Sequence, residues 1–328
     1  MSGLIAINTG DKSGLLYNGP TFTRIITTGS AQTWAKPPCN FVYMEWIGGG
    51  GAGGGGANAT DHSAGGGGGA AFNYGFFDGN TFPNVLTINI AAKTSNAGQG
   101  NPGSDGVQGN NTTITGTNLS LTGYGGGGGA GGGQGAAGGR SGGGGGGGTG
   151  GAGASVTTSH TGGNGGLPNL ADASTFAHGR SLAGRGAKGG DSNNEGANAS
   201  RGGGGGAGGT AEYDGEKGGG STYGAGGGGS GGDVSGSGTQ GGKRGGTWGS
   251  HTTGMGGQRA NSGNNRPAGN GISRKYGCGD GGGASQGTSS NAGDGGAPGG
   301  GGAGGGSGVV EGGTGGAGAR GEVRIWTW

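Results

Sequence analysis

The chain has 328 residues, of which 112 are glycine, and 18 basic and 16 acidic side chains give a formal net charge of +2. Glycine at about five times its usual share excludes an ordinary apolar core over most of the length. Only 8 prolines occur and no strict three-residue period holds, which excludes collagen, and the small net charge gives no bias toward nucleic acid or membrane surfaces.

The N-terminal sequence has neither a basic region nor a long apolar stretch, so it predicts no signal peptide. No run approaches the 18 consecutive apolar residues that a membrane-spanning helix needs. The two cysteines, Cys39 and Cys278, are far apart in the chain and are expected to be separate reduced thiols. These features predict synthesis and assembly in the cytoplasm.

Residues 1–26 are polar and mixed, and contain only short runs of strand character at 4–7 and 24–28. Two interpretations remain open for this segment. It is either an N-terminal arm that docks the protein in a larger assembly, or the first strands of the folded domain. When the chain is divided into domains, we assign residues 1–26 to the N-terminal arm.

A framework of short strands follows the arm. A proline-marked turn at 33–38 leads into 41–47, FVYMEWI, which is the strongest strand signal in the chain. A first glycine-rich excursion covers 48–70. Further strands are predicted at 71–77, 85–90, 111–115, 119–124 and 321–328. Val323 and Ile325 are expected on one side of the last of these strands.

Short strands separated by turn signals are typical of an antiparallel sandwich. The sequence therefore predicts an all-β fold with almost no α-helix, an antiparallel, jelly-roll-like β-sandwich over 27–124 that a strand at 319–328 completes. The long glycine tract at 125–318 is then an insertion whose two ends are both held by the sandwich.

The glycine tract has two possible structures. Glycine-rich composition without a period is typical of a flexible linker. The runs here are glycine with alanine, recur at similar lengths and are bracketed by strands, which favours a bundle of polyglycine II helices. Such helices have three residues per turn, and without Cβ atoms neighbouring backbones can approach closely enough to hydrogen-bond laterally. We expect the bundle to need the sandwich as a frame, because glycine loses the most entropy on folding.

Residues 29–37, GSAQTWAKP, followed by the strand at 41–47 and a glycine run, resemble the glycine-rich tail-fibre and adhesin-like proteins of bacteriophages. The closing segment at 318–326, GARGEVRIW, has the same resemblance, and the tract is similar to the polyglycine II bundles of T-even-type tip adhesins. A similar sandwich with a glycine insertion occurs in some animal receptor kinases. The resemblance spans about 27–328 and implies that loops between glycine helices contact a bacterial receptor.

Catalytic and cofactor sites are not predicted. The glycine-rich matches to dinucleotide motifs lack a strand, helix and acidic residue in one unit, and the four histidines lack partners at metal-ligand spacing. We therefore expect no enzyme activity, cofactor or metal. The candidates for binding are aromatic and basic residues in the interruptions of the tract, where they suit sugar stacking or protein contact. They are Tyr213, Tyr223, Arg244, Trp248, His251, Arg259, Arg266 and Tyr276.

Three hypotheses of function follow. The first is a phage virion protein, a tail fibre or tip adhesin that presents loops for host-surface recognition. The second is a capsid or tail decoration protein with a structural role, and the third is an ice-binding or matrix protein. For the virion protein we expect an oligomer in the particle, contacts to other virion proteins through the sandwich or arm, a protein or glycan receptor on the bacterial surface, and neither nucleic acid binding nor membrane insertion.

Overall fold

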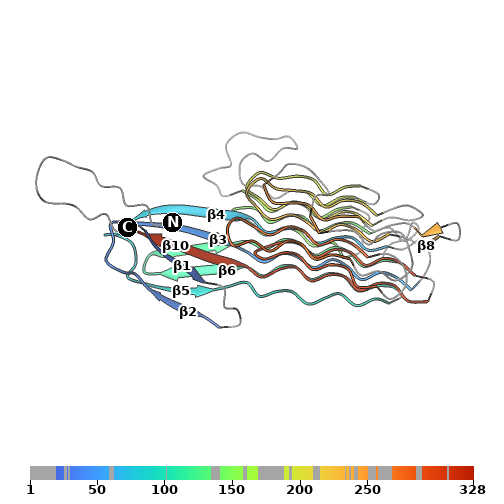
Figure 1. Cartoon of the computed structure of the whole chain (residues 1–328), viewed down its shortest axis with the longest axis horizontal. Helices are drawn as coiled ribbons and strands as arrows, with labels where there is room; N and C mark the ends of the chain where they lie inside the picture. The colour runs from blue at the N-terminus through green and yellow to red at the C-terminus, as the bar shows by residue number, and fades with distance from the viewer. Residues whose placement is uncertain are drawn as a thin grey trace, which may run out of the picture.

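The protein consists of a β-rich end and an array of extended glycine segments that run away from it (Figure 1). The computed structural model describes residues 20–25, 28, 30–58, 63–100, 102–133, 141–157, 161–168, 188–191, 194–209, 215–232, 234–235, 238–239, 243–249, 256–257, 268–285, 290–308 and 310–328. Within these ranges the chain has strands and extended segments but no helix, which confirms the all-β prediction for them.

One antiparallel sheet has four strands in the order β1-β10-β3-β4. Its members are β1 (Thr21–Ile25), β10 (Glu322–Thr327), β3 (Phe41–Ile47) and β4 (Phe72–Asp78). The last strand of the chain lies between β1 and β3, so both ends of the sandwich sequence meet in one sheet.

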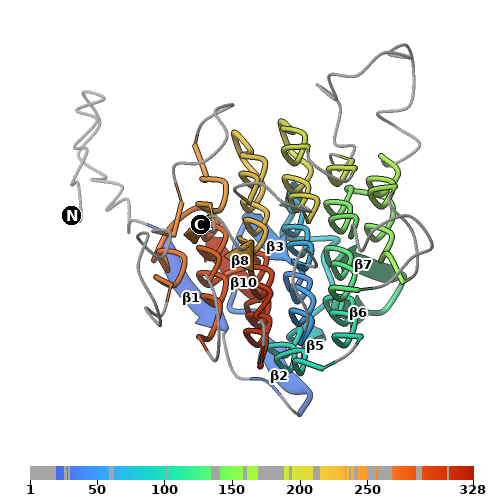
Figure 2. The same ribbon diagram turned by 90° about the vertical axis from the view of Figure 1, so that its right-hand side faces the viewer.

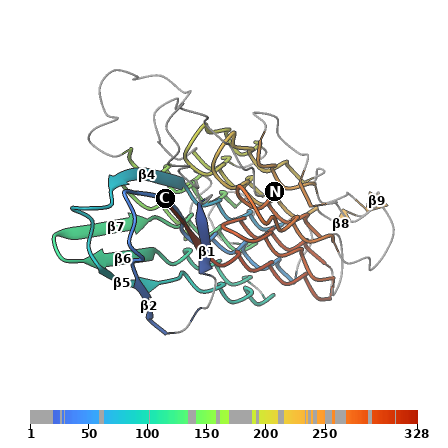
Figure 3. The same ribbon diagram turned by 60° about the vertical axis from the view of Figure 1, so that its left-hand side comes forward.

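The second antiparallel sheet has the order β2-β5-β6-β7. Its members are β2 (Gln32–Ala35), β5 (Val85–Asn89), β6 (Thr112–Gly116) and β7 (Leu119–Gly123). Both sheets lie at the same end of the molecule (Figure 3). A short hairpin of β8 (Val234–Ser235) and β9 (Gly238–Thr239) lies at the opposite end, which we call the far end.

The core lies between the two sheets. It is formed by alternating side chains, because successive residues of a strand point to opposite faces. The buried members are Trp34, Val42, Met44, Trp46, Phe82, Leu86, Ile88, Ile90, Ile114, Val323 and Ile325. Both sheets contribute to one cluster, so the arrangement is sandwich-like, and the two inward positions predicted on the last strand are confirmed.

Several strands predicted from the sequence are found within one or two residues of their predicted bounds. β3 coincides with 41–47, and β4, β5, β6, β7 and β10 match to within one or two residues. Two differences concern the beginning of the chain. The segment predicted as a turn at 33–38 overlaps β2, and residues 21–25 form β1 in the first sheet, in line with the second of the two interpretations of residues 1–26. The run at 4–7 lies outside the described residues.

The glycine segments run alongside one another from the sandwich to the far end and back (Figure 1), and seen from the far end they form an array of separate coils (Figure 2). They include 48–57, 63–71, 90–100, 103–111, 124–133, 141–148, 203–209, 225–232, 279–285, 300–308 and 312–320. Several begin or end at a strand of the sandwich. The excursion at 48–70 belongs to this array, and so does a second one between β5 and β6 that the sequence analysis did not predict.

Backbone hydrogen bonds join each segment to different neighbours in turn. Along 49–56, the N–H groups of Gly49, Ala52 and Gly55 donate to segment 104–110 at 2.8–2.9 Å. Those of Gly50, Gly53 and Gly56 donate to 313–319, and those of Gly51 and Gly54 to 65–68. The acceptor segment therefore repeats every third residue. The same cycle recurs along 65–70, whose donors alternate among 127–130, 204–207 and 299–302.

Interior glycines leave no room for a side chain. A Cβ atom built on Gly51 would lie on the backbone of Gly127, and one built on Gly128 would lie on that of Gly106. Where a segment borders solvent, only every third residue must be small. In segment 103–111, Gly103, Gly106 and Gly109 face the array, whereas the residues between them are exposed or half-buried.

Polar side chains complete the hydrogen bonding at the edges of the array. Gly125, Gly128 and Gly131 donate their N–H groups to side-chain oxygens at 2.8–3.1 Å. The acceptors are Asn111, Ser155 and Asp105. Similar bonds join Gly220 to Asn198 and Gly312 to Asn58.

Candidate functional site

A row of aromatic side chains crosses the outer face of the first sheet. Phe22, Trp326, Tyr43 and Phe76 are directly opposed in the strand register, one on each of the four strands. Neighbouring ring centroids are 4.9, 5.2 and 4.6 Å apart with tilts of 34–39°, within the range of favourable aromatic pairs. The row lies on the face opposite the core, because the alternate residues Val42, Met44 and Trp46 point inward.

Further aromatic residues extend the row on both sides. Phe41 precedes it on β3, and Tyr74 and Phe72 follow it on β4 toward the glycine segments. Tyr74 stacks near Phe72 with ring centroids 6.1 Å apart, and the Arg201 guanidinium lies 5.3 Å from the Tyr74 ring. We call the set formed by Phe22, Phe41, Tyr43, Phe72, Tyr74, Phe76, Tyr276 and Trp326 the aromatic face.

Turns of the glycine array meet this face at the sandwich end. Three of the residues predicted as binding candidates lie in these turns: Tyr223, Trp248 and Tyr276. The Trp248 indole N–H donates to the Tyr223 carbonyl at 3.0 Å, and Trp248 packs against the cluster that contains Ile47 and Cys278. The Tyr276 ring centroid is 6.1 Å from that of Phe22. These three residues therefore lie beside the sandwich, at the opposite end from the β8–β9 hairpin.

The turn beside Tyr276 has a backbone that requires glycine. Gly277 has φ of 75°, in the left-handed region that favours glycine. A Cβ atom on Gly277 would also lie within the Trp248 ring. The Trp248 ring thus covers a side-chain-free position, and the Gly277 carbonyl accepts a hydrogen bond from Arg324 Nη2 at 2.7 Å.

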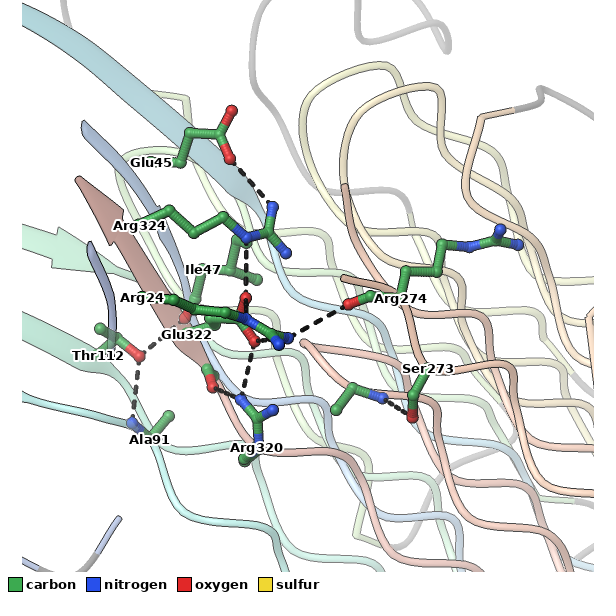
Figure 4. A network of polar contacts seen from close by, with 12 residues as sticks. Arg24, Glu45, Ile47, Ala91, Thr112, Ser273, Arg274, Arg320, Glu322 and Arg324 are labelled. Atoms are coloured by element: carbon green, nitrogen blue, oxygen red, sulfur yellow. Dashed lines mark hydrogen bonds and ion pairs between the residues drawn. The ribbon is translucent and has the colours of Figure 1, made fainter. Parts of the chain in front are cut away.

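A buried charged network fastens the turns to the sheet (Figure 4). The carboxylate of Glu322 on β10 is fully buried and accepts hydrogen bonds from Arg24, Arg320 and Arg324 at 2.6–3.0 Å. Arg324 is also fully buried and binds Glu45 on β3 at 3.0 Å. Because Arg24 also donates to the Arg274 carbonyl at 3.5 Å, the network joins β1, β3, β10 and the array.

The charges of the network influence one another's ionisation. Burial alone would raise the pKa of Glu322, but hydrogen bonds and charges from Arg24, Arg324 and Arg320 outweigh it and hold that pKa below its ordinary value. Burial raises the pKa of the nearby Cys278 thiol. Cys39 and Cys278 are both free, which confirms the expectation of separate thiols.

A second ion pair holds the turn at 274–280. Arg274 Nη2 lies 2.9 and 2.8 Å from the two carboxylate oxygens of Asp280. Asp280 Oδ1 also accepts a hydrogen bond from the backbone N–H of Trp248 at 2.9 Å. The Arg274 guanidinium lies 5.3 Å from the Trp248 ring. Charged groups of the site are thus used to position the turns, while the aromatic face offers apolar contact.

The remaining predicted binding residues are not brought to this site by the described part of the chain. Arg244 is exposed on the side of segment 243–247, where its carbonyl accepts the Gly218 N–H at 3.1 Å. Tyr213, His251, Arg259 and Arg266 lie outside the described residues. The other three histidines of the chain also lie outside them.

Sequence reasoning missed the aromatic row, although a signal for it exists. In β3 and β4 the outward positions carry Phe41, Tyr43, Phe72, Tyr74 and Phe76, with Glu45 as a charged exception, so the outer face of these strands is largely aromatic. A solvated antiparallel strand should alternate with polar residues. The alignment of the row across four strands depends on register, which the sequence alone does not give.

No family model and no curated protein matches this sequence. Among the described residues there is no group of three or more His, Cys, Asp or Glu side chains that could hold a metal ion. In the same part of the chain no helix is long and apolar enough to cross a bilayer.

Proposed function

We propose that the protein is a bacteriophage virion component, a tail-fibre or tip adhesin that acts by rigid presentation and without chemistry. In this proposal a polyglycine II bundle extends from a jelly-roll-like β-sandwich and holds turns at its far end for contact with the host surface. The resemblance of residues 27–328 to glycine-rich phage adhesins supports the assignment to a virion.

The observation that carries the proposal is the hydrogen-bond cycle of the glycine segments. A chain with three residues per turn directs successive N–H groups at intervals of about 120°, so each donor meets a different neighbour and the fourth returns to the first. The donors of segments 49–56 and 65–70 follow this order. Lateral bonds in several directions resist bending of each segment, in contrast to a glycine linker that has no fixed partners.

The attachment of the segments to the sandwich makes the far end a defined position. Strand β3 continues directly into segment 48–57, and segment 63–71 returns directly into β4. Segment 225–232 begins beside Ala70 and leads to the β8–β9 hairpin at the far end. We infer that this hairpin is among the surfaces presented to the host.

Competition for adsorption tests the proposal. The purified full chain should bind host cells and block adsorption of the phage. A variant in which the hairpin residues Val234, Ser235 and Thr239 are all changed to glycine should lose much of this effect. The matched control, Thr87→Ser on the exposed face of β5 at the sandwich end, should block as well as the original chain.

Labelling with gold-coupled antibodies then locates the protein in the particle. We expect label at the tips of tail fibres. Label confined to the capsid or tail tube, together with unchanged adsorption, would reject the adhesin and favour a decoration protein. Absence from purified particles would reject both virion assignments and leave an ice-binding or matrix role.

A further inference from the structure

We propose that the aromatic face is an interface through which two copies of this chain associate, each presenting the same face. This proposal does not depend on the assignment to a virion. It rests on where the glycine array stops covering the first sheet, on the composition of the two outer sheet faces, on the exposed area and on the pairing of charges.

The array covers only one end of the outer face. At that end Ile47 is fully buried beneath Ala225 and Cys278, and Phe72 packs against the same cluster. Further along the strands the cover ends at Tyr276, and the aromatic side chains become exposed. Phe76 is 71% exposed and Tyr276 is 54% exposed. The same apolar face is thus buried where the array reaches it and open beyond.

The second sheet shows how this protein builds an outer face that meets solvent. Apart from Val85, its outward positions on β5, β6 and β7 include Thr87, Asn89, Thr113, Thr115 and Ser120, as expected of an antiparallel sheet with one solvated face. The exposed outward positions of the first sheet carry aromatic rings instead, and its charged outward residues, Arg24, Glu45, Glu322 and Arg324, are paired with one another. A contiguous apolar patch of this kind marks an interaction surface.

The exposed area fits a protein partner. Phe41, Tyr74, Phe76 and Tyr276 are 42–71% exposed. At roughly 200 Å² for a complete aromatic side chain, these four alone expose about 450 Å². A standard interface buries about 800 Å² on each partner, so the four rings supply more than half of it. The half-buried rings of Phe22, Tyr43 and Trp326 adjoin them. Tyrosine, tryptophan and phenylalanine are also the residues enriched in interface cores.

The charges favour a second copy as this partner. The arginines beside the row, Arg24 and Arg324, are bound to Glu322 and Glu45 within the same chain. The arginines nearest the row are therefore neutralised within the chain, and two further cations, Arg201 and Lys275, lie over the Tyr74 and Tyr276 rings at the edges of the face. A two-fold axis brings the same patch of both copies together. Two-fold symmetry is the commonest symmetry of soluble oligomers.

Sedimentation velocity of the purified full chain tests the proposal. We expect the apparent mass to double with rising concentration, within about 100 µM, since interfaces of this size reach micromolar affinity or better. The variants Phe76→Ser and Tyr276→Ser change opposite ends of the aromatic face. Each should weaken association at least tenfold. Both side chains are more than half exposed, so the far-UV dichroism and melting temperature should stay close to those of the original chain.

Val85→Ser provides the matched control, because Val85 is 53% exposed on the second sheet. It should associate like the original chain. Three results would overturn the proposal: a monomer at every concentration, a dimer that both row variants leave intact, or an equal loss of association in the Val85 control. If one row variant fails to fold, the other still decides, and Phe41→Ser replaces the one that failed.

Discussion

Buried charge is the most demanding feature of this protein at the residue scale. Glu322 and Arg324 have no solvent exposure, and transfer of such ions from water costs several kcal/mol each unless they are paired. Here one carboxylate accepts bonds from three arginines that come from both ends of the sandwich sequence. The network stabilises one particular arrangement of β1, β10 and the turn at 274–277.

Glu322→Gln should lower the free energy of unfolding by about 3–5 kcal/mol, because it leaves the buried Arg324 without its main counter-charge. Urea denaturation followed by tryptophan fluorescence measures the loss. Glu195→Gln is the control, since the Glu195 and Lys217 side chains are 42% and 46% exposed and such pairs contribute at most about 1 kcal/mol. Equal stability of both variants would show that the network is not stabilising.

The pH dependence of the same variant gives a second test. The folded-state pKa of Glu322 is lowered, so its ionisation stabilises the fold at pH values above the unfolded-state value of about 4.3. That contribution is lost as the pH falls below about 4.3 and through the lower folded-state pKa. The difference in stability between the original chain and Glu322→Gln should therefore be largest near neutral pH and shrink on acidification. A difference that grows at acid pH would contradict this assignment.

Asp105 tests the role of side chains at the edge of the array. Its Oδ1 atom accepts the Gly131 N–H at 2.8 Å, and burial raises its pKa although that hydrogen bond opposes the shift. Asp105→Ala removes the acceptor and should cost about 1 kcal/mol in urea denaturation. Asp105→Asn keeps an acceptor oxygen without a buried charge and should be as stable as the original chain. An equal loss in both variants would mean that the carboxylate acts by its charge and not as an acceptor.

At the scale of the element, the glycine segments are organised by a period of three. Inside the array every side faces a neighbour, so long runs of glycine and alanine are needed. At the edge, segment 103–111 needs glycine only at 103, 106 and 109. The sequence GSDGVQGNN is thus explained by packing.

Alanine substitutions along this edge segment should show the period directly. Gly106→Ala places a methyl group on the Ala52 carbonyl and should destabilise the fold by about 1–3 kcal/mol, the usual cost of overpacking. Val107→Ala, at the next and exposed position, should change stability by less than about 0.5 kcal/mol. Thermal unfolding measures both. Similar losses at the two positions would argue against a three-residue repeat in this segment.

The elements differ in how well the sequence predicted them. The strands with strong aromatic and β-branched content, such as β3 and β10, were predicted because their pattern is local. β2 was missed because Pro37 and Pro38 suggested a turn, whereas Trp34 pairs with Leu86 and enters the core. The aromatic row and the Glu322 network were missed because both depend on contacts between residues distant in the chain, such as Arg24 and Glu322, which are 298 positions apart.

At the scale of the whole molecule, the sandwich and the array depend on each other. The ends of β3, β4 and β10 continue into glycine segments, and the Glu322 network ties a turn of the array to the sheet. Glycine loses about 1–2 kcal/mol of backbone entropy per residue on ordering, against about 1 kcal/mol gained per hydrogen bond. The array therefore needs the frame, while the frame gains cover for Ile47 and Phe72.

Amide hydrogen exchange of the intact chain tests the central claim, that the laterally hydrogen-bonded glycine segments are an ordered, rigid part of this protein. We expect the amides of segments 49–56, 65–70, 225–232 and 300–305 to be protected to a degree comparable with β3 and β10, because their N–H groups are bonded at 2.8–3.2 Å. Exchange of these segments at the rates of an unfolded chain, with protection confined to the two sheets, would contradict the account.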